Sequence, residues 1–207
     1  SAGVFFDDDK GKTLASGKPL FSARVIPYRG SWVEFDFDAN DILHVRVDRR
    51  RKMRATAFLR AFWFLERNVI LSDEEILGQF YEAEEVLSFE DRTAWVKLSP
   101  EVHNGAKVAD DVKAPRAKEA IVQAGKTLTP KLIEKLVEAG ITKIPLKAES
   151  LVNRRTGGRV VDAETGEVLV ETNQEITATL LAQIMGRRVA PFKLLAIVPG
   201  KTDASLH

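Results

Sequence analysis

The chain has 207 residues, of which 44% are hydrophobic, and it carries 31 Lys and Arg against 30 Asp and Glu. It contains no cysteine and only three histidines, which excludes a disulfide scaffold, thiolate metal sites and a histidine-rich metal cage. No apolar run reaches the roughly 20 residues of a membrane span and no signal-peptide pattern is present, so we expect a globular cytoplasmic protein without a membrane partner.

The near-neutral total hides three blocks of charge. The net charge is +4 over residues 1–71, −8 over residues 72–112 and +5 over residues 113–207. Such segregation indicates separate surfaces with separate partners, and it limits any nucleic-acid contact to a local basic patch.

The first third has the composition of a strand-rich domain. β-Branched and aromatic residues between turn signals predict four strands, at residues 3–6, 19–27, 31–38 and 42–49. Apolar side chains at helical spacing predict a helix from Ala55, with Trp63 in the core. Ser72 and Glu75 have the form of a capping box, which predicts a second helix within residues 72–86.

The last third contains an internal repeat. Residues 125–146 align with residues 173–194 at an offset of 48 positions. Each copy predicts a strand, a helix capped by Thr129 or Thr177, and a second short strand. Residues 163–166 between the copies predict a hairpin turn.

These elements predict an α+β fold in two domains. Residues 1–76 would form an antiparallel sheet with helices. Residues 77–207 would form a smaller α+β module with a strand-helix-strand pseudo-repeat. Residues 99–119 are polar and interrupted by proline and glycine, so we expect a linker or an irregular loop there.

One strand of the first domain carries an aromatic residue on its polar face. In the stretch SWVEFDFDANDILHVRVDRRRK, residues 31–52, alternation places Trp32 on the same face as carboxylates. A three-residue turn at 39–41 would pair Phe35 with Val45. It would also set Glu34 opposite Arg46 as an ion pair.

The same register brings Trp32 opposite Asp48, directly before a basic run. The candidate site residues are therefore Trp32, Asp48, Arg49, Arg51 and Lys52. An exposed ring can stack on a base for about 1–3 kcal/mol, guanidinium groups bind phosphates, and a carboxylate can accept from base amino groups. The pattern indicates a site for single-stranded nucleic acid.

Two other interpretations fit the same residues. Another part of the fold could cover Trp32, with the arginines protecting an exposed sheet edge from aggregation. A sugar-binding tryptophan platform is the second.

Motifs of catalysis are missing from the sequence. The Gly-Lys pairs at Gly11, Gly17 and Gly125 each lack either the second glycine or the Ser/Thr of a phosphate-binding loop. No histidine stands in a recognisable nucleophile–base context. We expect no catalytic residue, no metal ion and no cofactor in this chain.

Three motifs of the first domain resemble a known family. GVFFDDDKGKT, ARVIPYRGSW and VRVDRRRK resemble the lobe domain of the β subunit of bacterial DNA-directed RNA polymerase. From about residue 72, GKTLTPKLIEKL and DAETGEVL resemble the lineage-specific insertion in the lobe of many proteobacterial β subunits. The resemblance identifies the chain as a fragment of such a subunit.

The resemblance implies a place in the transcription machinery of the bacterial nucleoid. The lobe would form one wall of the downstream DNA cleft, and Trp32 would stack on an unpaired nontemplate-strand base, with Asp48 in the same pocket. Arg49 and Arg51 would be candidates for contacts with the DNA backbone.

The implied partners are DNA, the β′, α, ω and sigma subunits, and accessory transcription factors that dock on the insertion. The magnesium of this nucleotidyltransferase would be bound by another subunit. The alternative function is a protein–protein interaction module without direct nucleic-acid contact.

Overall fold

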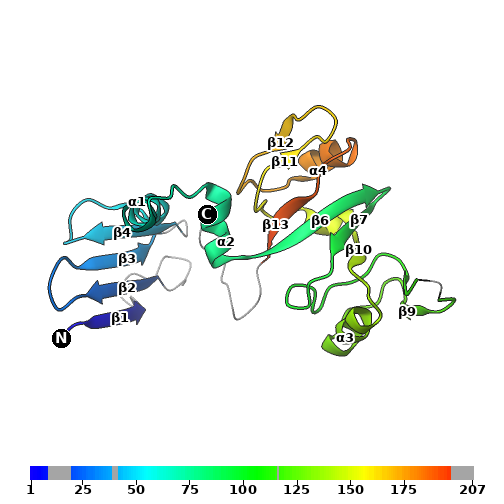
Figure 1. Ribbon diagram of the computed structural model, residues 1–207, viewed down its shortest axis with the longest axis horizontal. Coiled ribbons are helices and arrows are strands. Elements are labelled where there is room, and N and C mark those ends of the chain that lie inside the picture. The colour runs from blue at the N-terminus through cyan, green and yellow to red at the C-terminus, as the bar shows by residue number, and fades with distance from the viewer. Residues whose placement is uncertain (9–19, 39–41, 116, 197–207) are drawn as a thin grey trace. The chain divides into compact units, whose positions relative to one another are not determined.

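The computed structural model describes residues 1–8, 20–38, 42–115 and 117–196 (Figure 1). These residues form antiparallel sheets and four α-helices, which confirms the α+β class. The chain divides into two compact units. The described residues up to 72 belong to the first unit, and those from 73 to 196 belong to the second. The assignment of these units to a lobe and an insertion stays a prediction.

The first unit is built on a five-stranded antiparallel sheet in which each strand pairs with the next along the chain. Its strands are β1 (Gly3–Asp8), β2 (Phe21–Ile26), β3 (Val33–Phe37), β4 (Leu43–Val47) and β5 (Met53–Arg54). The helix α1 (Ala55–Arg67) follows β5 directly. The ring of Phe58 on α1 meets the ring of Phe35 edge-on, with 6.0 Å between the centroids.

The register between β3 and β4 is the one that alternation predicts. Phe35 pairs with Val45, which is fully buried, and Glu34 lies opposite Arg46. The predicted turn at 39–41 lies outside the described residues.

The expected Glu34–Arg46 ion pair is wrong. Glu34 instead receives the guanidinium of Arg24 on β2 at 2.7 Å, and Arg46 lies 3.9 Å from Asp36. The reason is that β3 is a central strand, so each of its carboxylates has a neighbour on both sides, whereas the sequence pattern considered only one.

The prediction that Trp63 belongs to the core is also wrong for this chain. Trp63 is only partly buried, and its helix neighbours Phe62 and Leu65 are exposed. Apolar side chains surround α1 on several sides, but a single sheet can cover only one face of a helix within the first unit.

The second unit begins with α2 (Asp73–Phe80), which starts directly after Ser72 as the capping pattern predicted. Its central sheet contains β6 (Glu82–Glu90), β7 (Thr93–Lys97), β10 (Lys143–Lys147) and β13 (Phe192–Ala196), in the order β10-β7-β6-β13. A helix continuing to residue 86 is therefore wrong. Pairing of β6 with β7 and β13 overrides the helical preference of its Glu and Ala residues.

The internal repeat is confirmed for the helix and the second strand of each copy, and it is longer than the aligned segments. The first predicted strand of each copy is wrong, because Thr127 and Glu175 form only isolated bridges and the strands before the two helices end at Val122 and Val170. The first copy contains β8 (Val112–Lys113), β9 (Ala120–Val122), α3 (Pro130–Glu138) and β10. The second contains β11 (Val160–Val161), β12 (Val168–Val170), α4 (Ala178–Met185) and β13, after the 3₁₀ helix η1 (Ala148–Leu151). The hairpin predicted at 163–166 joins β11 to β12.

Strand pairs that precede residue 125 in the first copy recur 48 positions later in the second copy. Val112 pairs with Val122 as Val160 pairs with Val170. Of the two interpretations of residues 99–119, the linker is wrong, because Val108 and Val112 are buried in the first copy. The irregular loop is confirmed for the described residues apart from the short strand β8. Only a few apolar residues in that polar stretch are needed to anchor it in the core.

The two copies flank one hairpin. β10 pairs with β7 and β13 pairs with β6, so each repeat adds one strand to an opposite edge of the β6–β7 pair. The predicted caps are present, since the Thr129 and Thr177 hydroxyls each accept a hydrogen bond from the backbone N–H three residues later. Both helices bury apolar side chains at matching positions, and the unit has its own hydrophobic core.

Candidate nucleic-acid interface

Trp32 and Asp48 close the open end of the β3–β4 hairpin. The Asp48 N–H donates to the Trp32 carbonyl at 2.8 Å, and the Trp32 N–H donates to the Asp48 carboxylate at 2.7 Å. The two residues therefore face each other in the predicted register. Asp48 does more than the sequence indicated, because its side chain fixes the backbone from which the indole projects.

The Asp48 carboxylate is held in its charged form. Its pKa lies below the usual range, first because the side chain of Ser31 donates a hydrogen bond to it, and then because the Trp32 N–H does so. The nearby charge of Arg50 acts in the same direction.

The chain turns sharply after β4. Asp48 and Arg49 are both left-handed, with φ of 50° and 57°, and the Arg50 N–H donates to the Val47 carbonyl at 3.0 Å. Two consecutive positive φ values are the signature of a type I′ turn. Asp is a favoured residue at the first central position of such a turn, but the second position normally holds Gly, so an arginine there made the sequence signal weak.

This turn brings Arg49 onto Trp32. The guanidinium carbon of Arg49 lies 5.7 Å from the centroid of the indole, within the range of a cation–π contact. Trp32 keeps 38% of its surface exposed, and Arg50 and Arg51 are exposed beside it. The arrangement provides an accessible aromatic ring next to exposed cations.

Lys52 forms an ion pair with a carboxylate of the sheet and not with Asp48. Its ammonium group lies 3.1 Å from the Asp36 carboxylate on β3. The structure thus brings together Trp32, Asp48 and Arg49 and leaves Arg51 exposed, but it pairs Lys52 with the sheet.

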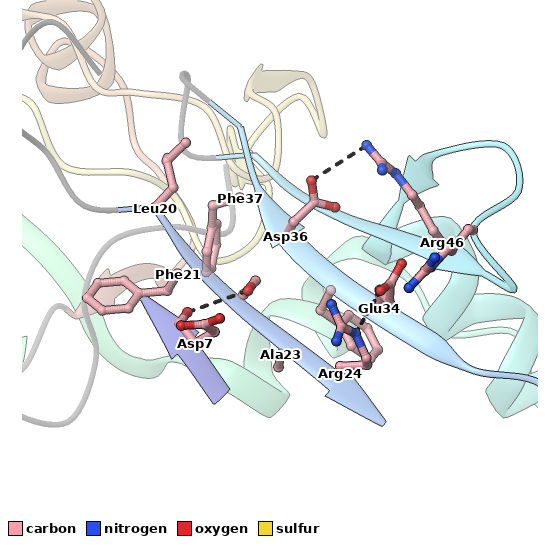
Figure 2. A pocket seen from close by; sticks show the side chains of 12 residues that line it. Asp7, Leu20, Phe21, Ala23, Arg24, Glu34, Asp36, Phe37 and Arg46 are labelled. Carbon is pink, nitrogen blue, oxygen red and sulfur yellow. Dashed lines mark hydrogen bonds and ion pairs between the residues drawn. The ribbon is translucent and has the colours of Figure 1, made fainter. Parts of the chain in front are cut away.

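The polar face of the first sheet contains a shallow hollow of about 400 Å³ (Figure 2). Its lining includes Arg24, Glu34, Asp36, Arg46 and Arg49. Ion pairs among these side chains offset their charges, so the hollow offers little net positive charge to a phosphate.

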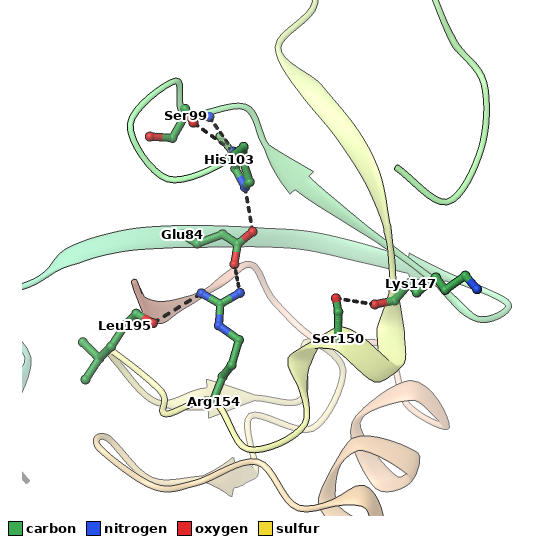
Figure 3. A network of polar contacts seen from close by, with 7 residues as sticks. All are labelled: Glu84, Ser99, His103, Lys147, Ser150, Arg154 and Leu195. Atoms are coloured by element: carbon green, nitrogen blue, oxygen red, sulfur yellow. Dashed lines mark hydrogen bonds and ion pairs between the residues drawn. The ribbon is translucent and has the colours of Figure 1, made fainter. Parts of the chain in front are cut away.

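A buried polar cluster in the second unit was not foreseen from the sequence (Figure 3). His103 Nε2 lies 2.6 Å from the Glu84 carboxylate, whose other oxygen accepts from Arg154. His103 Nδ1 lies against the backbone of Ser99, 2.9 Å from its nitrogen and 3.0 Å from its carbonyl oxygen. Glu84 and His103 are each 1% exposed, so these two side chains cannot reach a substrate. The cluster links β6 to the segments that precede β8 and follow η1.

Other kinds of site find no support among the described residues. In that part of the chain, no group of three or more His, Asp or Glu side chains could hold a metal ion. None of its helices has the length and apolar character that crossing a membrane requires. Gly125 lies in a turn with φ of 77°, and the pairs at Gly11 and Gly17 lie outside the described residues.

Comparison with known proteins gives a consistent set of relatives, although no family model matches. The chain is 40% identical over 205 residues to a protein of Anaeromyxobacter sp. (strain Fw109-5) and 41% identical over 197 residues to one of Sorangium cellulosum (strain So ce56). It is 38% identical over 207 residues to one of Desulfatibacillum aliphaticivorans. All three are named DNA-directed RNA polymerase subunit beta.

These alignments cover nearly all of this chain but little of the relatives. They include 95% of the chain in the first two cases and 100% in the third, against 14% or 15% of the relative. The chain therefore spans about one-seventh of the length of the curated relatives it matches.

Proposed function

The chain belongs, as one segment, to the family of DNA-directed RNA polymerase β subunits, and from this premise we propose that its first unit contacts DNA inside such an enzyme. The parent enzyme would be a nucleotidyltransferase that works with the β′, α, ω and sigma subunits in the bacterial nucleoid. This segment would serve it by binding the nontemplate strand beside the downstream duplex rather than by chemistry.

The observation that carries the proposal is the exposed indole of Trp32 on a rigid support. Asp48 fixes the backbone of Trp32 through two hydrogen bonds, so the ring can meet a base without first being ordered. Every base has a flat face, so stacking on the ring would accept any unpaired nucleotide. Exposed Arg51 supplies a cation for the adjoining phosphates.

The test is a Trp32→Ala substitution in the complete β subunit, reconstituted into polymerase. Loss of one stacked base, about 1–3 kcal/mol, predicts that promoter complexes dissociate roughly fivefold to 150-fold faster. Trp63→Ala, on α1, is the control and should change the lifetime little. Equal lifetimes for the two variants would favour the alternative, a protein–protein module without nucleic-acid contact.

For the second unit we propose a role as an inserted platform for accessory transcription factors. Its first helix and its last described strand are tied together, because Lys193 on β13 lies 2.9 Å from Glu74 on α2. A compact body that leaves and returns at one place can be inserted into another domain without disturbing it. Polymerase in which a short linker replaces residues 73–196 should retain basal transcription. Loss of basal transcription would contradict an accessory role.

A further inference from the structure

We propose that Arg49 is a positioning residue that backs one face of the Trp32 ring, so that an unpaired base stacks on the opposite face. The base, the indole and the guanidinium would then form a three-layer stack. This inference rests on the proposed DNA contact of Trp32. It replaces the role in binding the DNA backbone that the family resemblance implies for Arg49.

The local backbone supports a dedicated role for this contact. Asp48 and Arg49 both adopt left-handed conformations, which aspartate tolerates but arginine adopts rarely and with strain. The turn closes through the hydrogen bond from the Arg50 N–H to the Val47 carbonyl. This unusual geometry is the one that returns Arg49 to the indole, with 5.7 Å between the guanidinium carbon and the ring centroid.

The neighbouring cations leave Arg49 free for this task. Arg50 and Arg51 are exposed and follow Arg49 directly, so they can meet phosphates without it. Asp48 holds the backbone of Trp32, and Arg49 lies against its ring. Two consecutive residues of one turn therefore restrict the backbone and the side chain of the same tryptophan, which lowers the ordering cost of stacking.

The first experiment measures whether Arg49 covers the ring. In the 207-residue chain with Trp63 and Trp95 replaced by Phe, acrylamide should quench Trp32 fluorescence about twofold faster after Arg49→Asn, since one face becomes open. Asn tolerates the left-handed backbone, so the turn is kept. Arg50→Ala removes the same charge and should leave quenching unchanged. Equal quenching in all three proteins would overturn the inference, whatever the DNA experiment shows.

The second experiment asks whether Arg49 acts through the base. In reconstituted polymerase, a cation–π contact at an exposed site predicts that Arg49→Asn shortens promoter-complex lifetime about twofold to fivefold. Abasic nucleotides are placed singly along the unpaired nontemplate strand next to the downstream duplex. At the position that Trp32 occupies, the effects of Arg49→Asn and Trp32→Ala should both vanish, whereas that of Arg50→Ala should persist.

The outcomes separate the two proposals. If the Arg49→Asn effect persists on abasic DNA while the Trp32→Ala effect vanishes, Arg49 is a phosphate contact and the inference is wrong. If the effect of Trp32→Ala is the same at every abasic position, the proposed stacking function itself is wrong, and the three-layer stack falls with it.

Discussion

Removal of the Glu84 carboxylate should destabilise the second unit more than removal of any neighbouring charged group would. In Glu84→Ala, buried His103 loses its 2.6 Å acceptor and Arg154 loses its carboxylate partner. Breaking a buried ion pair by deleting one partner costs about 3–5 kcal/mol of unfolding free energy. We expect about 3 kcal/mol, the lower end, because the Arg154 side chain is 26% exposed and water can solvate it.

The loss should depend on pH in a defined direction. Burial by itself would raise the pKa of Glu84, but the hydrogen bond from His103 and the charges of Arg154 and His103 outweigh burial and lower it. A lowered folded-state pKa stabilises the fold above the unfolded value of 4.5, and this contribution is lost as the pH falls through the folded pKa. The difference between the wild type and Glu84→Ala should be complete at neutral pH and shrink below about pH 4.5.

Urea unfolding followed by Trp95 fluorescence measures this loss in the second unit, with Trp32 and Trp63 replaced by Phe. The control is Glu85→Ala, the next residue on β6, whose partly exposed carboxylate lies 3.4 Å from Lys97. Exposed ion pairs contribute about 0–1 kcal/mol, so this change should be small. The reasoning is refuted if Glu84→Ala costs no more than Glu85→Ala, or if its cost is the same at pH 4 and pH 7.

Further predictions concern caps, glycines and Asp48. Thr129→Ala and Thr177→Ala should each lower the unfolding free energy by about 1 kcal/mol in urea titrations, and Thr→Ser should restore most of it. Gly78→Ala, in open space on α2, should raise stability by about 0.5–1 kcal/mol. Gly125→Ala, at φ of +77°, should lower stability by about 1–2 kcal/mol, and equal effects at both glycines would contradict this reasoning. The lowered pKa of Asp48 means that any stabilisation it provides is present above pH 3.8 and lost at lower pH, so acid titration of Asp48→Asn should show a smaller decrease in stability.

Local patterns in the sequence were enough to define several elements. Alternation of apolar and polar residues specified the β3–β4 register, because a slip by one residue would turn every apolar side chain to the other face. The same register placed Trp32 opposite Asp48. The threonine caps were equally predictable, since a cap depends on a side chain and a backbone N–H only three residues apart.

Tertiary structure decided the features that depend on distant partners. Residues 82–86 have helical composition, yet they form a strand because β13 pairs with all of them and β7 pairs with the rest of β6 from Val86 onward. The polar stretch before residue 120 belongs to the repeat because Val108 and Val112 are buried in the core of the second unit. Glu34 forms an ion pair with Arg24 and not with Arg46, and Arg49 contacts Trp32 because of a strained turn. A sequence contains the candidates for such contacts, but which pair forms depends on the neighbouring strand and the backbone angle that bring two groups within a few ångströms.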